Sequence, residues 1–206
     1  MLIVWGRDNS VNVQKVLWFC EEAGVAYDRR DAGLQFGVVG TPGYRSMNPN
    51  GLVPTIDDGG FVLWESNVIV RYLAAKHGRG SLWLEDPQRR ARADQWMDRS
   101  NTTIWPTIRP LFFGLVRTPP EKRDAALLEQ QRVATAAICK TLDRHLERNA
   151  YMAGDELTIG DIPLGCALWR WFALDVEKPE TPNLQRWFDR LSERPAFRKI
   201  VLHPLT

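Results

Sequence analysis

Apolar positions recur with two different periods along this chain, and the change of period divides it into two parts. Before residue 79, short apolar runs indicate strands at 2–6, 25–32, 53–57 and 61–63. Apolar residues spaced three or four apart indicate helices at 12–24 and 65–78. Residues 33–50 are rich in glycine and are expected to form a loop, within which a short helix fits at 42–47. The predicted order of elements is therefore β-α-β-α-β-β-α, which is a small α/β unit.

The connections between these strands predict how they pair. A right-handed crossover through the helix at 12–24 makes the first two strands parallel. Asp58 and Gly59 lie between two apolar runs, and an Asp-Gly pair in that position is a strong hairpin signal. We therefore expect the last two strands to be antiparallel.

Strand signals stop after a linker at residues 79–86. Helical patterns then cover 87–117, 121–148, 158–175, 183–193 and 195–201. Pro106 and Pro110 predict a bend in the first of these helices. We predict an α/β domain over 1–78 and an all-helical domain over 87–206.

The segment "LTIGDI" predicts how one of the later helices begins. Thr158 and Asp161 have the spacing of a capping box, in which each side chain accepts a hydrogen bond from the other residue's backbone N–H. Leu157 and Ile162 flank the box as a hydrophobic staple.

Composition narrows the classes of function. The net charge is +2, and the arginines alternate with acidic residues, unlike the clustered positive charge of a nucleic-acid-binding surface. Cys20, Cys139 and Cys166 have no metal-binding spacing with each other or with the histidines, so we expect buried thiols, no metal, and a reducing compartment such as the cytoplasm. No apolar run approaches the ~18 residues of a membrane span, and residues 1–10 do not resemble a signal peptide.

Three places in the α/β unit combine backbone and side-chain groups that can hold a ligand. Pro54 opens a strand, and a cis bond there would turn the backbone of Val53 towards an extended peptide; a trans proline at a sheet edge is the alternative. Glu65 and Ser66 open a helix whose free N–H groups attract a carboxylate, unless Ser66 is an ordinary helix cap. Ser10 and Asn12 lie at another helix start, where they would either cap the helix or donate hydrogen bonds to a thiolate.

Taken together, these stretches resemble the cytosolic glutathione transferase family. The resemblance lies in "NPNGLVPTIDDGGFVLWESNVIVRYLA", with its N-P-x-G-x-V-P segment, hairpin and E-S helix start, and in "TIGDIPLG" of the helical part. It covers essentially the whole chain. It implies a thioredoxin-like N-terminal domain, an all-α C-terminal domain and a homodimer, with glutathione as co-substrate and a small apolar electrophile as second substrate.

The resemblance also assigns roles to individual residues. Ser10 takes the place of the catalytic serine of theta-like members, and Asn12 matches the asparagine of nu-like bacterial members. Val53 beside cis-Pro54 pairs with the cysteinyl backbone of glutathione, and Glu65 and Ser66 hold its γ-glutamyl end.

One position departs from the family. Many relatives carry Arg or Lys before the V-P pair, where this chain has Leu52. A basic side chain such as Arg45 is a candidate substitute. No tyrosine lies near Ser10 and no cysteine lies at 7–13, which argues against the tyrosine-dependent classes and against mixed-disulfide chemistry.

The second-substrate pocket is expected from residues 100–115 and 165–175, with four aromatic candidates: Trp105, Phe112, Trp169 and Phe172. Core packing is the alternative for each of them. Two other functions stay open from the sequence. One is a glutathione-dependent peroxidase or disulfide reductase, and the other is a non-catalytic ligand-binding module of the same fold.

Overall fold

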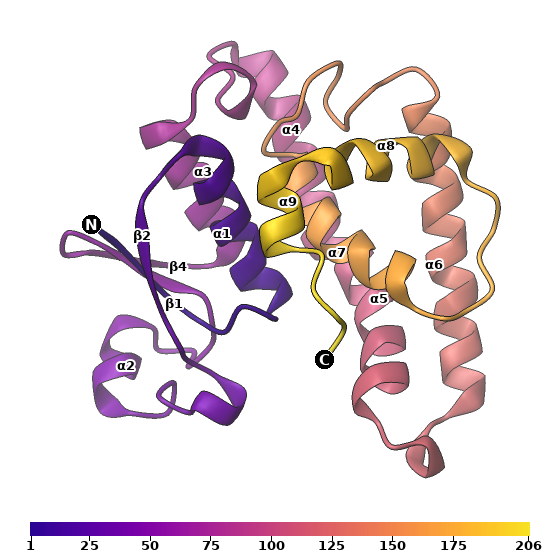
Figure 1. Cartoon of the computed structure of the whole chain (residues 1–206), viewed down its shortest axis with the longest axis horizontal. Coiled ribbons are helices and arrows are strands. Elements are labelled where there is room, and N and C mark those ends of the chain that lie inside the picture. Colours follow the sequence, from indigo (N-terminus) through magenta and orange to yellow (C-terminus); the bar gives the residue numbers. More distant parts are fainter. The chain divides into compact units, whose positions relative to one another are not determined.

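The computed structural model describes the backbone of residues 1–206 and every side chain except that of Ser81. The chain divides into two compact units, Met1–Trp83 and Leu84–Thr206. The first is an α/β unit and the second is all-helical (Figure 1). The predicted fold class is confirmed.

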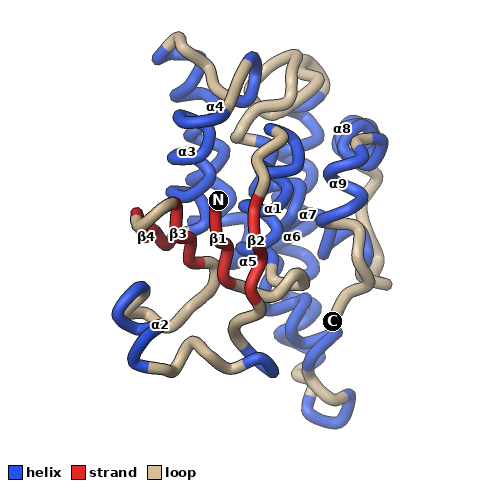
Figure 2. Tube along the Cα trace, turned by 60° about the vertical axis from the view of Figure 1, so that its left-hand side comes forward, coloured by secondary structure: helices blue, strands red, loops and turns tan.

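The N-terminal unit is built on one mixed sheet whose strands lie in the order β2-β1-β3-β4 (Figure 2). Its elements are β1 (Leu2–Trp5), α1 (Val11–Ala23), β2 (Tyr27–Arg30), α2 (Pro42–Met47), β3 (Thr55–Asp58), β4 (Phe61–Trp64) and α3 (Ser66–His77). β1 and β2 are parallel, and β3 pairs antiparallel with both β1 and β4. The crossover and hairpin expectations are therefore confirmed.

Two helices bury their apolar faces against one side of this sheet. α1 and α3 lie side by side on it, and α2 lies on the other side (Figures 1 and 2). Val4 in β1 and Ile56 in β3 are fully buried, as are Val16 in α1 and Ile69 in α3. These residues occupy the apolar positions from which strands and helices were predicted, because burial of those positions holds the elements together.

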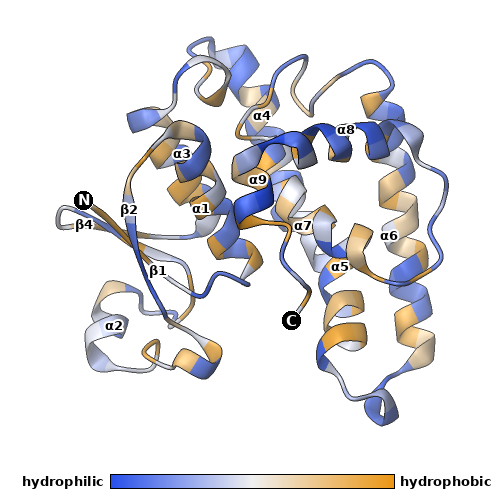
Figure 3. Cartoon of the chain, in the orientation of Figure 1, coloured by the Kyte–Doolittle hydropathy of each residue, from blue (hydrophilic) through white to orange (hydrophobic). Residues whose placement is uncertain are grey.

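The second unit contains only helical elements: α4 (Pro87–Arg99), α5 (Trp105–Phe112), α6 (Ala125–Leu146), α7 (Asp161–Ala173), α8 (Pro182–Glu193) and α9 (Pro195–Ile200). α7 is buried along most of its length, as expected of a helix that is apolar on all sides. α8 is mostly hydrophilic (Figure 3) and buries only Leu184, Trp187, Phe188 and Leu191. α7 is therefore the core helix of this unit, and α8 contributes one face to the core.

The two prolines of the 87–117 helix change its hydrogen bonding without ending it. Ser100–Ile104 is π-helical, α5 follows with Pro106 in its first turn, and Phe113–Arg117 is π-helical again. Proline has no N–H to donate within a helix. The wider π turns on both sides of α5 keep this segment helical around Pro106 and Pro110.

One half of the predicted capping box is present at the start of α7, whereas the N–H of Asp161 donates to the backbone oxygen of Thr158 and not to its hydroxyl. The carboxylate of Asp161 accepts hydrogen bonds from the backbone N–H of Thr158 at 2.9 Å and from its hydroxyl at 3.1 Å. The hydroxyl of Thr158 accepts from the N–H of Gly160 at 3.2 Å. The regular helix begins at Asp161, later than the predicted residue 158, because Ile159 and Gly160 form the turn inside the box.

All three cysteines are fully buried, as predicted. Burial raises the pKa of the Cys20 thiol to about 12, and it raises that of Cys139 to the same value. In the part of the chain that the structure describes, no group of His, Cys, Asp or Glu could hold a metal ion. The same residues contain no helix long and apolar enough to cross a membrane.

Candidate active site

The loop between β1 and α1 places Ser10. After β1 ends, the N–H of Gly6 still donates to Arg30 O at 2.8 Å, and the N–H of Arg7 donates to Ala32 O at 3.2 Å. Gly6 has φ 154°, and a Cβ there would lie 2.4 Å from Cγ2 of Val13. Only glycine lets the chain turn this close to α1.

Ser10 directly precedes α1, but its hydroxyl does not cap the helix. Its backbone has extended geometry, with φ −80° and ψ 124°, and no side-chain capping bond forms. Serine at this position ordinarily accepts a hydrogen bond from an N–H in the first turn. Ser10 is 6% exposed. The capping alternative is therefore not what the structure contains, and the hydroxyl stays available to a ligand at the positive end of the helix dipole.

α1 and α3 are connected by a short chain of polar groups. The hydroxyl of Ser66 donates to Oδ1 of Asn12 at 3.3 Å, and Nζ of Lys15 donates to Oγ of Ser66 at 3.4 Å. Lys15 is 1% exposed and Ser66 is 4% exposed. A buried ammonium group thus lies beside the first residue of α3. It adds positive charge where the helix dipole already favours an anion.

Glu65 gives α3 an open N-terminal end. It has φ 71° and ψ 107°, a left-handed conformation that is uncommon outside glycine. It forms no side-chain capping bond, and Ser66 is the first helical residue rather than the cap. Non-glycine residues held at positive φ cluster at ligand-binding sites. The residue in the capping position, Glu65, therefore supplies no side-chain acceptor to this first turn.

A buried network of hydrogen bonds holds the segment that precedes β3 in place. The hydroxyl of Tyr44 donates to Leu52 O at 2.7 Å, and Nδ2 of Asn48 donates to the same oxygen at 2.9 Å. Both side chains also contact Oγ1 of Thr55, at 2.9 Å and 3.0 Å. Asn48 and Thr55 are buried. This network anchors both ends of the 52–55 segment.

The Val53–Pro54 peptide bond is cis, which confirms the expectation drawn from the resemblance. Val53 precedes β3, and the pairing of β3 with β1 begins only at Thr55. The backbone of Val53 therefore lies outside the strand register.

Leu52 and Arg45 lie on the same loop as this network. The side chain of Leu52 is 64% exposed, and its carbonyl is the group that the network holds. Arg45 donates from Nη1 to Pro49 O at 3.2 Å, so its guanidinium lies over the 49–51 turn. The loop therefore presents an apolar side chain at position 52, with a basic group nearby.

Comparison with known proteins identifies this combination of elements. A family model described as "Glutathione S-transferase, N-terminal domain" matches residues 9–76, and one described as "Glutathione S-transferase, C-terminal domain" matches residues 104–195. The chain is 43% identical to glutathione S-transferase GstB of Escherichia coli K12, with 100% of each sequence covered. This chain belongs to the glutathione S-transferase family. It is also 31% identical to glutathione S-transferase 3 of Zea mays, over 97% of this chain and 93% of the other.

Solved structures agree with this assignment. A theta-class glutathione S-transferase from Xanthomonas axonopodis pv. citri, with glutathione bound, is 45% identical with a TM-score of 0.96. The alignment covers 100% of this chain and 99% of the other. The apo form of that protein gives 41% identity and a TM-score of 0.87, over 100% and 98% of the two chains. The comparisons favour a glutathione transferase over the peroxidase or disulfide reductase and the non-catalytic module.

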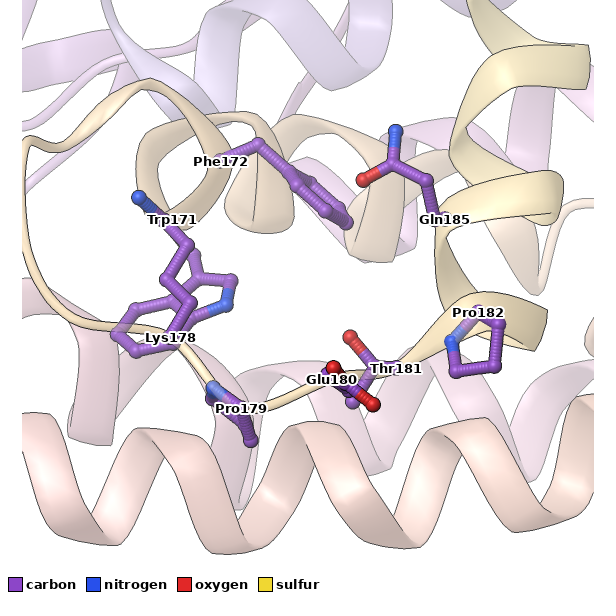
Figure 4. Close-up of a pocket in the computed structure, with 8 residues that line it drawn as sticks. All are labelled: Trp171, Phe172, Lys178, Pro179, Glu180, Thr181, Pro182 and Gln185. Carbon is purple, nitrogen blue, oxygen red and sulfur yellow. The ribbon is translucent and has the colours of Figure 1, made fainter.

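Two cavities of the helical unit are lined by one each of two aromatic residues predicted for the second-substrate pocket of this glutathione S-transferase. Trp169 lines a cavity of about 540 Å³ with Leu115, Val116 and Leu205 among its neighbours. Phe172 lines a different cavity of about 370 Å³, formed with Trp171 and the 178–185 segment (Figure 4). Trp169 and Phe172 instead meet at Phe188, whose ring stacks against both.

Trp105 and Phe112 line neither of these two cavities. Their rings lie 6.4 Å apart, centroid to centroid, and Phe112 is 3% exposed. Core packing therefore describes Phe112 in the structure, whereas Trp169 and Phe172 each face a cavity.

Sequence reasoning missed Tyr44, Asn48, Thr55 and Lys15. The first three act through backbone positions that only the folded loop brings together. Lys15 carried a signal, because it is a charged residue within the otherwise apolar helical pattern of α1.

Proposed function

We propose that this glutathione S-transferase binds glutathione on its N-terminal unit and stabilises the glutathione thiolate with the hydroxyl of Ser10. The observation that carries the proposal is the uncapped end of α1, where a serine in capping position makes no capping bond. A hydroxyl donor and the helix dipole both favour the charged form of a nearby thiol.

The chemistry that follows is a nucleophilic substitution or addition. A free thiol with a pKa near 8.5 is only a few per cent ionised at about pH 7. With an aryl chloride, the thiolate sulfur forms a C–S bond, the C–Cl bond breaks, and chloride leaves with its electron pair. The thiol proton passes to solvent before attack. Lowering the thiol pKa by about two units would ionise most of the bound glutathione, at about 2.7 kcal/mol of differential interaction.

The binding subsites follow from the same unit. The N-terminal turn of α3 and the hydroxyl of Ser66 would hold the γ-glutamyl carboxylate, with Glu65 facing its ammonium group. Val53 would pair its backbone with that of the cysteinyl residue. In the structure Asn12 accepts the hydrogen bond of Ser66, and this single hydroxyl proton would pass from Asn12 to the carboxylate when glutathione binds.

Lys15 would partly supply the positive charge that many relatives carry at the position of Leu52. Its ammonium group is buried beside Ser66, so its charge is less screened than that of an exposed residue at position 52. Glutathione binding therefore does not depend on a basic side chain before the V-P pair.

The test is the dependence of turnover on pH. With chlorodinitrobenzene and saturating glutathione at about pH 6.5, Ser10→Ala should reduce turnover about tenfold or more, and the loss should shrink as pH rises. Ser46→Ala is the matched control, because Ser46 is an exposed serine in the same unit that bonds only to Gly43 O. An unchanged pH–rate profile in Ser10→Ala would refute the role of Ser10.

Family membership and the burial of the thiols support the remaining assignments. We infer a homodimer, and a cytoplasmic location in which the buried thiols stay reduced. We also infer that the helical unit supplies the pocket for the second substrate, with Trp169 as its aromatic wall. Sedimentation of the purified protein at several concentrations tests the dimer.

A further inference from the structure

Guanidinium groups gather around one aromatic ring in the helical unit. The guanidinium carbon of Arg109 in α5 lies 5.0 Å from the ring centroid of Phe113, and that of Arg117 lies 4.6 Å from the same centroid. Arg117 also lies 5.1 Å from the ring of Phe112. Two cations therefore share one ring, an arrangement that stabilises each of them separately but does not remove their mutual repulsion.

A third arginine strengthens this repulsion. Arg170 in α7 is 3% exposed and donates from Nη1 to Cys166 O at 2.8 Å. Burial lowers the pKa of Arg170 to about 10, and the charge of Arg117 lowers it too. Burial also lowers the pKa of Arg117, with a further contribution from Arg109. Each positive charge makes the others less favourable, so a bound anion would stabilise all three.

Within the described part of the chain, no acidic side chain forms an ion pair with Arg109 or Arg117. The fork of Arg117 instead holds one main-chain oxygen. Its Nε and Nη2 donate to Thr206 O at 3.1 Å and 2.8 Å. This is the pair of parallel donors that arginine presents to a carboxylate. The two donors of Arg117 thus already have the orientation that binding a carboxylate requires.

The sequence neighbours of Arg117 and Thr206 line a cavity. Val116 and Leu205, which directly precede Arg117 and Thr206, both line the cavity of about 540 Å³ that Trp169 also lines. Most of its other lining residues are apolar. Its charged lining residues are Arg123, which donates to Thr118 O and Leu115 O, and Asp175, which is exposed and whose charge acts on Lys178.

We propose that Arg117 binds the carboxylate of an anionic second substrate, with Arg109 and Arg170 adding positive charge and the apolar part of the substrate lying against Trp169 and Leu205. This inference rests on the proposed function and specifies its second substrate as an electrophile that carries a carboxylate. The carboxylate displaces the oxygen of Thr206 from the fork of Arg117.

The test compares two substrates that differ only in charge. A chloronitrobenzoate and the corresponding chloronitrobenzamide share the ring, the leaving group and the reaction, so their kcat/KM ratio isolates recognition of the carboxylate. Arg117→Gln should lower kcat/KM for the benzoate about tenfold or more and leave that for the amide within about twofold. Arg109→Gln should lower the ratio about threefold to fivefold, since Arg109 adds charge without holding the carboxylate.

The matched control is Arg144→Gln, which removes the same charge from an exposed position on α6 and should leave the ratio unchanged. Circular dichroism checks that each variant is folded. If Arg117→Gln is not folded, the kcat/KM ratio of Arg109→Gln tests the inference, because Arg109 is exposed. Equal effects on both substrates, or no effect on the ratio in either variant, would overturn the inference. If the wild-type protein converts neither the amide nor the benzoate, the proposed function is overturned and this inference with it.

Discussion

The N-terminal ends of the helices differ between the two units of the molecule. In the helical unit, α4, α6 and α7 begin with side-chain caps from Asp86, Asp124 and the Thr158–Asp161 pair. Asp143 similarly accepts hydrogen bonds from the first N–H groups of α8. In the α/β unit, α1 and α3 begin without any side-chain cap. The division is not one between the units as such, because Thr41 caps α2 in the α/β unit and α9 in the helical unit has no side-chain cap. We propose that the ends of α1 and α3 are left open for glutathione.

The comparison has a physical basis. The first N–H groups of a helix need acceptors, and a side chain that supplies one stabilises the fold by about 1 kcal/mol. A helix that lacks this acceptor offers its N–H groups and dipole to an anion instead. Ser10 and Glu65 occupy the capping positions but form no side-chain capping bond. A ligand can therefore supply the acceptor that a capping side chain would otherwise provide.

The largest effect is expected on the free energy of unfolding, at the start of α7, where Asp161 accepts the most hydrogen bonds. Asp161 is fully buried and accepts hydrogen bonds from Met152 N, Trp187 Nε1 and two donors of Thr158. Asp161→Ala leaves these donors without an acceptor and should lower the free energy of unfolding by about 4 kcal/mol. Urea denaturation measures it. Asp155→Ala, at an exposed position nearby, should change it by less than about 0.5 kcal/mol.

The second effect is on binding at an open end. Ser66→Ala removes a hydroxyl at the start of α3 and should weaken glutathione binding about tenfold, as expected for one hydrogen bond to a charged group. Titration calorimetry measures the affinity, with Ser46→Ala as the control. Unchanged affinity in Ser66→Ala would show that the open end of α3 does not hold glutathione.

A third prediction compares the two kinds of helix end directly. Asp124 caps α6 through the N–H of Leu127, so Asp124→Ala should cost about 1 kcal/mol of unfolding free energy. Ser10→Ala removes no capping bond and should cost less than about 0.5 kcal/mol. Equal losses in the two variants would mean that Ser10 caps α1 in solution, which would contradict the comparison.

The smallest effect is expected on the thermal midpoint, from the hydrogen bonds that join β3 to the C-terminal half of α3. Asp58 in β3 accepts hydrogen bonds from Lys76 and Tyr72, and these bonds hold the pKa of its carboxyl below the usual range. A lowered folded-state pKa contributes stability above the unfolded value of about 3.9 and loses it as pH falls through the folded value. Asp58→Asn should lower the thermal midpoint by about 2 °C at neutral pH. The difference from wild type should vanish in acid, which calorimetry at several pH values checks.

The elements and their order were predictable because each has a local cause. Periodic apolar positions indicated the helices, Asp58-Gly59 indicated the hairpin, and Thr158 with Asp161 indicated the start of α7. The π-helical segments beside α5 were not predictable, because they depend on how the chain accommodates two prolines within one packed helix.

The candidate site was predictable only in part. Residue types at helix starts pointed to Ser10 and Ser66, but the same types are equally suited to capping, and only the geometry separates the two roles. The network that holds Leu52 O joins Tyr44, Asn48 and Thr55 from different elements, so no local pattern announces it. The same limit applies to the arginines around Phe113, which come from separate turns and helices.

The central claim is that the open end of α1 and Ser10 keep the glutathione sulfur negatively charged. The most direct measurement is the pKa of the bound thiol, followed by the ultraviolet absorbance of the thiolate as pH is varied. We predict a value about two units below that of free glutathione in the wild-type complex, and a rise of about one unit or more in Ser10→Ala. A bound thiol that titrates like free glutathione, or identically in the two proteins, would contradict the claim.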